Sequence, residues 1–475
     1  MSDKDKKTEG QGRKALKSGV WYTAANFLTK GIAFITTPIF TRLLTKQDFG
    51  LFSNYTSWLT IIGIFVTLNL TATLISARYE YEDDFDGFLF SMLGLSSLSA
   101  IIWFVVFNVF GDYFTSLFGM ERIYMNVMLL YLFFMPAVDL FQGRERYFFE
   151  YKKSVAASLA IAFGTAGLSV LLVVLMEDKL RGRIFGSALP TVVLGLAFYI
   201  FFFIKGKKIK LEYWKYALPI CLPYIPHLLS LNLLNSMDRV MITKYCGSEQ
   251  NAIYTLAYTC GSVVTMLMNS MNGAFAPWLG NKLNADDTES IKKVSNTYII
   301  GFVILACGIM AVAPEILFIM GGRAYADAKY VMAPIAMGCV CQFIYTMFVN
   351  VEQFKRKTVG MAVASAVAAG VNFVLNWIFI PRVGYLAAAY TTLVGYLCLL
   401  LIHMYLVHRL GLSYVYDYKR IALIVTAMMG FTALMAFMYT QPLIRYAFVG
   451  IYVIVLLAVM IRYKDMLMSL LKRRK

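Results

Sequence analysis

Residues 26–42 read NFLTKGIAFITTPIFTR, an apolar stretch typical of a membrane-spanning helix, with Lys30 near its centre. Tyr22 and Asn26 precede Lys30 by eight and four residues, so the three side chains share one face of a helix. A lysine at mid-depth in a bilayer costs several kcal/mol if it faces lipid. We therefore expect Lys30 to face the interior of a helical membrane protein.

Two explanations for Lys30 are open at this stage. It could line a water-filled cavity and attract an anionic group, or it could form a structural ion pair with a buried acid such as Asp139 or Glu315. Arg42 and Arg78 lie near the ends of apolar stretches and are further candidate cations for such a cavity.

The composition excludes an ordinary soluble protein. Of 475 residues, 59% are hydrophobic and 15% are charged, whereas soluble domains carry about 25% charged residues. The net charge is +17, but the basic residues fall in short gaps between apolar stretches, which is typical of membrane proteins and not of nucleic-acid binding. No nucleic-acid partner is expected; membrane lipids are.

Apolar stretches long enough to cross a bilayer recur along the whole chain, and their connectors are short. The sequence therefore predicts an all-α polytopic membrane protein with about fourteen transmembrane helices and no separate soluble domain. The predicted spans are 18–41, 50–76, 88–110, 122–141, 155–176, 184–204, 216–241, 251–277, 294–315, 329–350, 358–380, 385–408, 420–440 and 442–462.

Alternate connectors differ in their content of lysine and arginine. The connectors on the side of the N-terminal tail carry the larger share, and so does the C-terminal tail. Because basic residues stay on the cytoplasmic side, both termini are expected to be cytoplasmic.

A weak internal repeat divides the chain. GLFSNYT at 50–56 resembles AIYTLAY at 252–258, a spacing of 202 residues. Six helices per half is an even number, so the halves would share one orientation and be related by an axis along the membrane normal. The predicted domains are a tail at 1–17, six-helix bundles at 18–210 and 211–410, and two added helices with a basic tail at 411–475.

The seventh predicted span carries polar residues much as the first one does, and at the 202-residue spacing Asn232 corresponds to Lys30. Pro223 and Pro226 are expected to bend or loosen this span. The candidate substrate-contacting residues of the two spans and their helix ends are Lys30, Asn26, Tyr22, Arg42, Arg78, Tyr224, Asn232, Asn235 and Arg239. The candidate ion-coupling or gating residues are Asp139, Asp238, Glu315 and His227.

Motifs for covalent chemistry are missing from the sequence. There is no GxxxxGK[ST] phosphate loop, no HExxH and no GxSxG, and none of the seven cysteines forms a CxxC pair. We expect no enzyme, no metal centre and no cofactor other than a coupling Na⁺ or H⁺.

Three stretches resemble one transporter family. They are TTPIFTRLLTKQDFGLFSNYTSW at 36–58, DRVMITKYCGSEQNAIYTLAYT at 238–259 and NFVLNWIFIPRVGYLAAAYTTLVGY at 372–396. Together they are similar to the polysaccharide transport (Wzx-type) flippases of the multidrug/oligosaccharidyl-lipid/polysaccharide exporter superfamily. The matching signature positions are Arg42, Asp238, Arg239, Tyr254, Asn372, Asn376 and Pro381.

The resemblance implies a flippase of the bacterial cytoplasmic membrane. It would move oligosaccharides linked to undecaprenyl or another polyprenyl pyrophosphate from the inner to the outer leaflet, for capsule, O-antigen or exopolysaccharide. It would work by alternating access, driven by an ion gradient, with a polysaccharide polymerase as a candidate partner. Lipid II flippases are expected to carry several cavity arginines, and here we find one mid-span lysine and arginines at helix ends.

Physical reasoning agrees with this expectation, because a pyrophosphate cannot cross hydrocarbon without compensating charge. Three alternatives remain, one of which is a non-transporting scaffold, which would not need Lys30. A multidrug or cation antiporter of the same superfamily would have an acidic cavity. A polysaccharide polymerase or ligase would have a large outside loop with arginine and histidine, and the connectors here are short.

Overall fold

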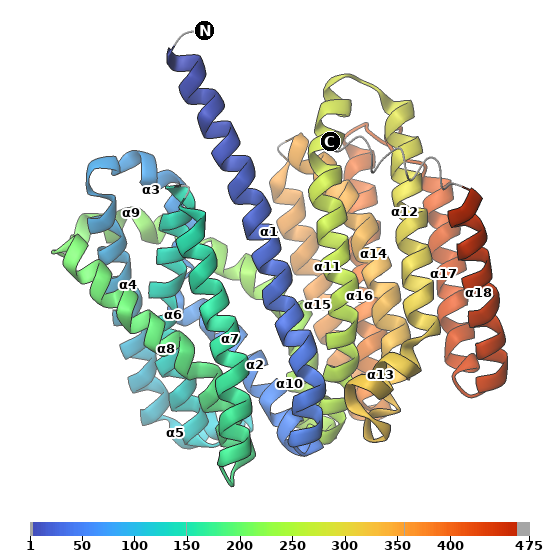
Figure 1. Cartoon of the computed structure of the whole chain (residues 1–475), viewed down its shortest axis with the longest axis horizontal. Helices are drawn as coiled ribbons and strands as arrows, with labels where there is room; N and C mark the ends of the chain where they lie inside the picture. Colours follow the sequence, from blue (N-terminus) through green and yellow to red (C-terminus); the bar gives the residue numbers. More distant parts are fainter. Residues whose placement is uncertain (1–2, 149, 356, 463–475) are drawn as a thin grey trace. The chain divides into compact units, whose positions relative to one another are not determined.

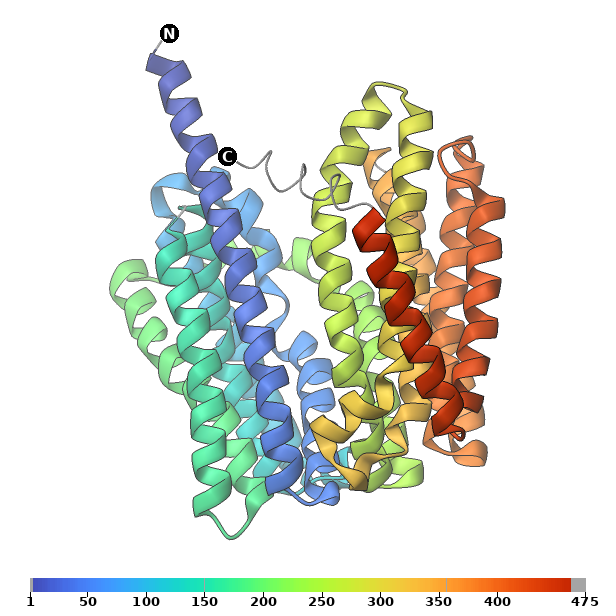
Figure 2. The same ribbon diagram turned by 45° about the vertical axis from the view of Figure 1, so that its right-hand side comes forward.

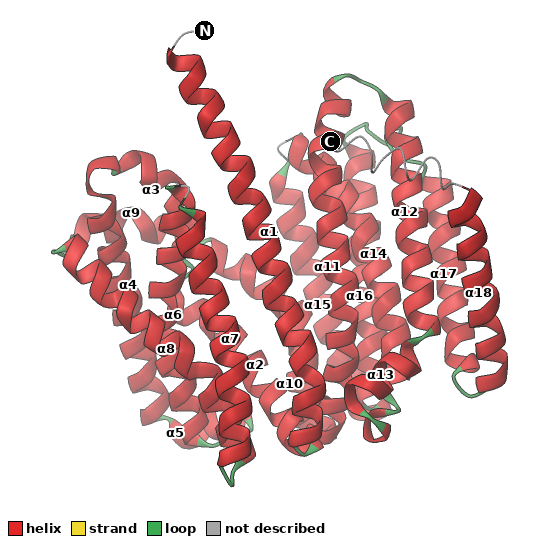
Figure 3. Cartoon of the chain, viewed as in Figure 1, coloured by secondary structure: helices red, strands yellow, loops and turns green. Residues whose placement is uncertain are grey.

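The computed structural model describes residues 3–148, 150–355 and 357–462, and these residues form helices joined by short loops (Figure 3). Side chains are described from Trp21 to Ile461, except those at 149, 227, 231, 356, 358, 459 and 460. The N-terminal tail side chains and the basic C-terminal residues beyond 462 therefore lie outside the described part. The predicted all-α architecture is confirmed for the part that the structure describes.

The first half of the chain contains six predicted spans, and short helices interrupt the second and follow the third. Its elements are α1 (Asp3–Leu43), α2 (Lys46–Thr67), η1 (Leu70–Thr73), α3 (Leu74–Glu80), η2 (Glu82–Asp84), α4 (Phe85–Val109), α5 (Gly111–Phe118), α6 (Arg122–Tyr147), α7 (Tyr151–Leu175) and α8 (Lys179–Gly206).

The second half also contains six predicted spans, with a break in its first span and short helices after its third, and two further helices follow it. Its elements are α9 (Leu211–Cys221), α10 (Tyr224–Cys246), α11 (Ser248–Asn284), α12 (Thr288–Ala311), α13 (Ala313–Gly321), η3 (Arg323–Tyr325), α14 (Ala328–Phe354), α15 (Thr358–Val383) and α16 (Tyr385–Arg409). The added helices are α17 (Tyr418–Met438) and α18 (Pro442–Arg462). Two six-helix halves and two C-terminal helices are therefore present, as predicted.

Ten of the described helices are long and apolar enough to cross a membrane. The other predicted spans correspond to α1, α10, α11 and α18. Polar side chains reduce the mean hydropathy of these three helices: α1 and α10 carry the lysine, asparagine, aspartate and arginine residues singled out above, and α11 carries Asn269 and Asn272. The protein is a multi-pass membrane protein.

Two predicted spans are interrupted. The span predicted at 216–241 breaks between α9 and α10, where Pro223 lacks the N–H that a continuous helix needs. The span predicted at 50–76 breaks at Leu68 and Asn69, whose φ values are 54° and 49°. Those left-handed residues stop α2 and turn the chain into η1.

Ser53 and Thr255, which are related by the 202-residue spacing, meet in the structure, and Asn251 meets Gly50 one residue out of that spacing. The Ser53 and Thr255 hydroxyl oxygens are 2.6 Å apart, and the Asn251 side-chain amide donates to the Gly50 carbonyl at 2.9 Å. Equivalent positions touch each other where a two-fold axis passes between them. The starts of α2 and α11 are therefore packed together by a local pseudo-two-fold relation that supports the predicted repeat.

The chain folds as two compact units. Unit 1 contains residues 1–255 and 365–388, and unit 2 contains residues 256–364 and 389–475. In unit 1, α1 and α8 pack against α7, and α10 packs against α2 (Figure 1). In unit 2, α14 is the most buried of the ten spans, and α18 lies beside α12 (Figure 2). Since α10 lies in unit 1, the polar residues of the first and seventh spans are held in the same unit.

The close approach at Gly50 gives a test of this packing. A Cβ atom at Gly50 would lie 1.8 Å from the Ser248 carbonyl oxygen, whereas a Cβ atom at Gly301 of α12 would have no heavy atom within 4 Å. We expect Gly50→Ala to destabilise the protein by about 1–3 kcal/mol, because backbone atoms must move apart. Gly301→Ala is the matched control and should be neutral or stabilising by up to about 1 kcal/mol. Thermal unfolding in detergent measures both, and equal effects would contradict this packing.

Candidate functional site

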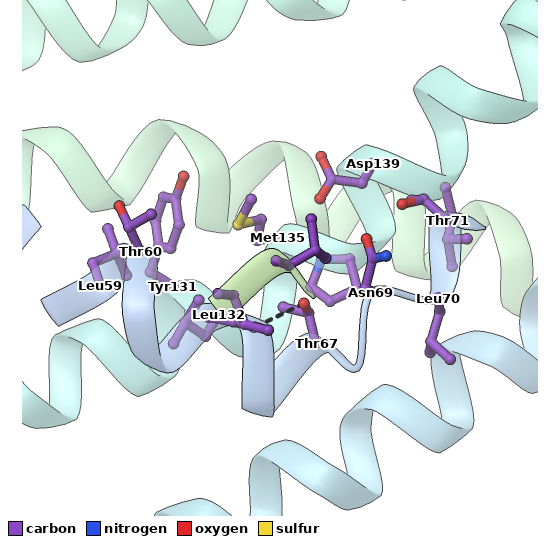
Figure 4. A pocket seen from close by; sticks show the side chains of 15 residues that line it. Leu59, Thr60, Thr67, Asn69, Leu70, Thr71, Tyr131, Leu132, Met135 and Asp139 are labelled. Atoms are coloured by element: carbon purple, nitrogen blue, oxygen red, sulfur yellow. Dashed lines mark hydrogen bonds between the residues drawn. The ribbon is translucent and has the colours of Figure 1, made fainter. Parts of the chain in front are cut away.

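A pocket of about 290 Å³ lies inside unit 1, where α2 breaks (Figure 4). Its walls come from the end of α2, from η1, from the middle of α6 and from Leu228 of α10. Most of the lining is apolar. The polar lining residues are Thr60, Thr67, Asn69, Thr71, Tyr131 and Asp139.

The local sequence explains how the pocket forms. Asn69 tolerates the left-handed conformation because its short polar side chain can hydrogen-bond locally, whereas Leu68 adopts it at a cost. The break turns the chain away from the axis of α2 and leaves the last carbonyl groups of that helix without the next turn of N–H donors. Thr67 donates its hydroxyl hydrogen to the Gly63 carbonyl at 2.8 Å, within α2.

Asp139 projects from α6 into this pocket. Its carboxylate lies at the same end of the pocket as the Asn69 amide and the Thr71 hydroxyl (Figure 4). Within the described part of the chain, Asp139 forms no ion pair and no hydrogen bond through its carboxylate. Since an intramembrane carboxylate needs water, a proton or a cation, this is a chemically competent position for ion binding. Its role in ion coupling stays a prediction.

A second polar cluster surrounds Asp238 on α10. The Tyr254 hydroxyl donates to Asp238 Oδ2 and the Asn376 amide donates to Asp238 Oδ1, each at 2.6 Å. The same Asn376 amide also donates to Asn372 Oδ1 at 3.1 Å. All four side chains are at most 1% exposed. Four of the signature positions are thus brought together, from the consecutive helices α10 and α11 and from the distant α15.

In this cluster a tyrosine hydroxyl and an asparagine amide donate hydrogen bonds to a buried carboxyl group. Such donors compensate part of its desolvation, and the role of Asp238 in ion coupling or gating stays a prediction. The sequence indicated each of the four residues through the resemblance, but not that they would meet at one carboxyl group. A buried contact across 138 residues leaves no mark in local sequence patterns.

The predicted stripe on α1 is partly exposed. Asn26 and Lys30 are exposed, and Tyr22 is half-buried with the Arg146 guanidinium 5.3 Å from its ring centre. In the described part of the chain, Lys30 makes no ion pair. The structure therefore holds Lys30 on a helix of unit 1 without neutralising it by an acid of that unit.

Glu315, one of the acids proposed as a partner for Lys30, has a different partner. Arg445 of α18 binds its carboxylate with hydrogen bonds of 2.7 and 2.5 Å, and the Tyr446 hydroxyl adds a third at 3.0 Å. Burial acts to raise the pKa of Glu315, but the hydrogen bonds from Arg445 and Tyr446 outweigh it and lower this pKa. The pair ties α13 to α18 within unit 2.

The two candidate arginines lie at helix ends with local partners. Arg42 donates to the Pro38 carbonyl at 2.8 Å within α1. Arg78 of α3 forms a 3.4 Å ion pair with Glu82, and its guanidinium lies 4.7 Å from the Phe148 ring centre. These contacts order the two side chains and leave their roles in substrate binding as predictions.

The candidates on α10 differ in exposure. Tyr224 and Asn235 are exposed, Arg239 is half-buried, and the Asn232 amide donates to the Leu228 carbonyl at 2.9 Å. The backbone of His227 lies in α10, but its side chain is outside the described residues.

Comparison with protein families gives two matches. Residues 15–283 match the model of the family described as polysaccharide biosynthesis protein, and residues 223–378 match the MatE model. The first match covers more than half of the chain. A search of curated proteins found no significant match.

Comparison with solved structures shows the fold. The chain is similar to the lipid II flippase MurJ in an inward closed conformation, with 12% identity, a TM-score of 0.68 and coverage of 94% of this chain and 100% of that one. It is similar to an inward-facing multidrug resistance MATE transporter of the MOP superfamily, with 14% identity, a TM-score of 0.59 and coverage of 81% and 95%. It is also similar to a MOP-superfamily transporter from Pyrococcus furiosus, for which a reversed polarity of the binding pocket suggests a different function. There the identity is 15%, the TM-score 0.57 and the coverage 84% and 96%. The fold is that of MOP-superfamily flippases and transporters.

The Asp238 cluster can be tested through its tyrosine. We expect Tyr254→Phe to lower the free energy of unfolding by about 1–3 kcal/mol, because it removes a donor from a fully buried carboxyl group. Tyr414→Phe is the control, since Tyr414 is half exposed. Thermal unfolding of the purified variants measures the difference. A Tyr254→Phe variant as stable as Tyr414→Phe would show that the hydrogen bond from Tyr254 to Asp238 does not stabilise the protein.

Proposed function

The chain belongs to the polysaccharide biosynthesis protein family, and from this we propose that it is a flippase for oligosaccharides linked to a polyprenyl pyrophosphate. It would move capsule, O-antigen or exopolysaccharide precursors from the inner to the outer leaflet of a bacterial cytoplasmic membrane, with both termini cytoplasmic. The substrate comes from the family resemblance, and the fold of flippases and transporters is consistent with it.

The single observation that carries the proposal is Lys30. It lies within a membrane helix, it is exposed on unit 1, and no acid neutralises it in the described part of the chain. A cation in this position is stabilised by water or by an anion, not by lipid tails. A pyrophosphate headgroup is such an anion, and the polyprenyl tail can remain in the bilayer.

The sugar part of the substrate needs hydrogen-bonding and aromatic surfaces. The exposed or half-buried polar residues of α1 and α10 supply these surfaces. Both helices lie in unit 1. Candidate contacts are Tyr22, Asn26, Tyr224, Asn232, Asn235 and Arg239 on the two stripes, with Arg42 and Arg78 at the helix ends.

We propose that an ion gradient supplies the energy, because the sequence has no phosphate-binding loop for ATP. A coupling Na⁺ or H⁺ would alternate between bound and free states as the transporter changes its access. Asp139, which lines a pocket, and Asp238, which accepts hydrogen bonds from Tyr254 and Asn376, are the candidate acids. A polysaccharide polymerase is a candidate partner.

A multidrug or cation antiporter is the second candidate function. The match of residues 223–378 to the MatE model favours it, and the similarity to a MATE transporter fits it as well as the flippase proposal. A polymerase or ligase is disfavoured, since the fold is shared with transporters and flippases. The sign of the charge required for transport separates the two transport functions.

The test uses Lys30 variants in proteoliposomes with polyprenyl-pyrophosphate-linked oligosaccharide. We expect Lys30→Ala to slow translocation roughly tenfold or more, since a lost charge-assisted contact costs about 1.5–3 kcal/mol. Lys30→Arg should keep part of the rate. Lys152→Ala on α7 is the control, because Lys152 is exposed and precedes the apolar part of its helix.

Cationic dye efflux is measured in the same vesicles. Full oligosaccharide transport in the Lys30→Ala variant would overturn the role of this lysine. Dye efflux by the wild-type protein without oligosaccharide transport would establish the antiporter function instead. Normal amounts of monodisperse protein in every variant exclude a folding defect as the cause.

A further inference from the structure

We propose that the pocket at the break of α2 is a binding site for a small monovalent cation, with Na⁺ as the probe and Asp139 as its charged ligand. The inference rests on the proposed function, because it assigns the coupling ion to one place and one chemistry. The geometry of the broken helix, the side-chain oxygens and the net charge of the pocket each support it.

The end of α2 is electrostatically suited to a cation. The C-terminus of a helix carries a partial negative charge, and its last carbonyl oxygens have no N–H donors within the helix. At the end of α2, Leu68 and Asn69 have left-handed backbone conformations, so no further helical turn supplies N–H donors to these carbonyl oxygens. In transporters, unwound carbonyls and half-helix C-terminal ends of this kind coordinate Na⁺ or H⁺.

The pocket places side-chain oxygens next to that helix end. Asp139 contributes a carboxylate, Asn69 an amide oxygen and Thr71 a hydroxyl, all at one end of the pocket (Figure 4). Oxygen ligands are the ones that hard cations prefer. A volume of about 290 Å³ leaves room for a cation that keeps some of its water.

The charge of the pocket selects a monovalent ion. Among the described residues that line it, Asp139 is the one that is charged, and no lysine or arginine is present. Bound Na⁺ would make the site neutral, whereas a divalent ion would leave an uncompensated positive charge in an apolar region. A phosphate or other anion would meet a carboxylate without a compensating cation.

The other candidate acids do not present their carboxyl groups in this way. Asp238 accepts hydrogen bonds from Tyr254 and Asn376, and Glu315 accepts from Arg445. Among these three acids, and within the part of the chain that the structure describes, Asp139 is the one whose carboxylate faces a pocket without a hydrogen-bonded partner.

The site is also connected to the helix that carries the candidate substrate contacts. The Cys221 thiol at the end of α9 donates to the Asn69 carbonyl at 3.7 Å, and Leu228 of α10 lines the pocket. A cation at Asp139 would thus hold α2 and α6 together beside the junction of α9 and α10. Its release would loosen that junction, which is a physical route for coupling the ion to substrate movement.

The experiment measures Na⁺ binding by the purified full-length protein without substrate. Thermal unfolding is followed as NaCl replaces choline chloride at constant ionic strength and pH, and radioactive ²²Na⁺ binding is measured in parallel. We expect a saturable rise of a few degrees in the wild-type melting temperature. Asp139→Asn should abolish the Na⁺-dependent rise in melting temperature and the ²²Na⁺ binding. Thr71→Val should weaken the affinity for Na⁺ roughly tenfold, as expected for the loss of one oxygen ligand.

Asp112→Asn is the matched control, since Asp112 is an exposed acid on α5 outside the pocket. Persistent Na⁺ binding by Asp139→Asn would overturn the proposal. The absence of a Na⁺ effect in the wild-type protein would also overturn it. A proton site at Asp139 would give that result, and Asp139→Asn would then change only the pH dependence of melting.

Failure of the proposed function gives a different result. Because the binding assay contains no substrate, Na⁺ binding at Asp139 in a protein that does not move lipid-linked oligosaccharide would refute the flippase and leave the cation site intact. Oligosaccharide transport by a protein without Na⁺ binding would refute the cation site and leave the flippase intact.

Discussion

The structure depends on one constraint: inside a bilayer, a polar backbone or side-chain group must find its partner within the protein or in a water-filled space. Helices meet this demand along most of the chain. Where α2 breaks at Leu68 and Asn69, the freed backbone lies beside a pocket. Where Asp238 is fully buried, Tyr254 and Asn376 supply neutral donors. At the candidate functional positions, the polar groups are satisfied by side chains of other helices or lie in a pocket, and not within a continuous apolar helix.

The two halves use one scaffold with different polar contents. The fourth span of each half, α6 or α14, ends with a glutamate that is 1% exposed: Glu145 or Glu352. The backbone carbonyl of each glutamate accepts a hydrogen bond from the N–H five residues later, from Glu150 at 2.8 Å and from Lys357 at 2.9 Å. Glu145 is bound by Arg144, whereas Glu352 is bound by His403. The repeat therefore preserves the backbone while the side-chain partners diverge, which permits the halves to differ in ion and substrate contacts.

Much of the fold could be predicted, because the length of an apolar run and the polarity of its neighbours decide where a helix crosses a membrane. Pro223 also indicated the break between α9 and α10, since proline removes a backbone donor. The break of α2 was not predicted, because Leu68 and Asn69 are unremarkable within an apolar stretch and adopt positive φ only in this tertiary setting. For the candidate site, the sequence indicated Asp139 and Asp238 singly, but not the pocket or the partners.

The sequence by itself determined a helical membrane protein with two repeated halves, an unusual mid-span lysine and a set of intramembrane acids. These follow from local hydropathy and spacing, which every part of the chain carries within itself. Only the tertiary structure decided that Glu315 is tied to Arg445, that Asp238 is satisfied by Tyr254 and Asn376, and that Asp139 faces a pocket. The physical reason is that the state of a buried charge is set by neighbours from distant helices, and those neighbours are chosen by packing.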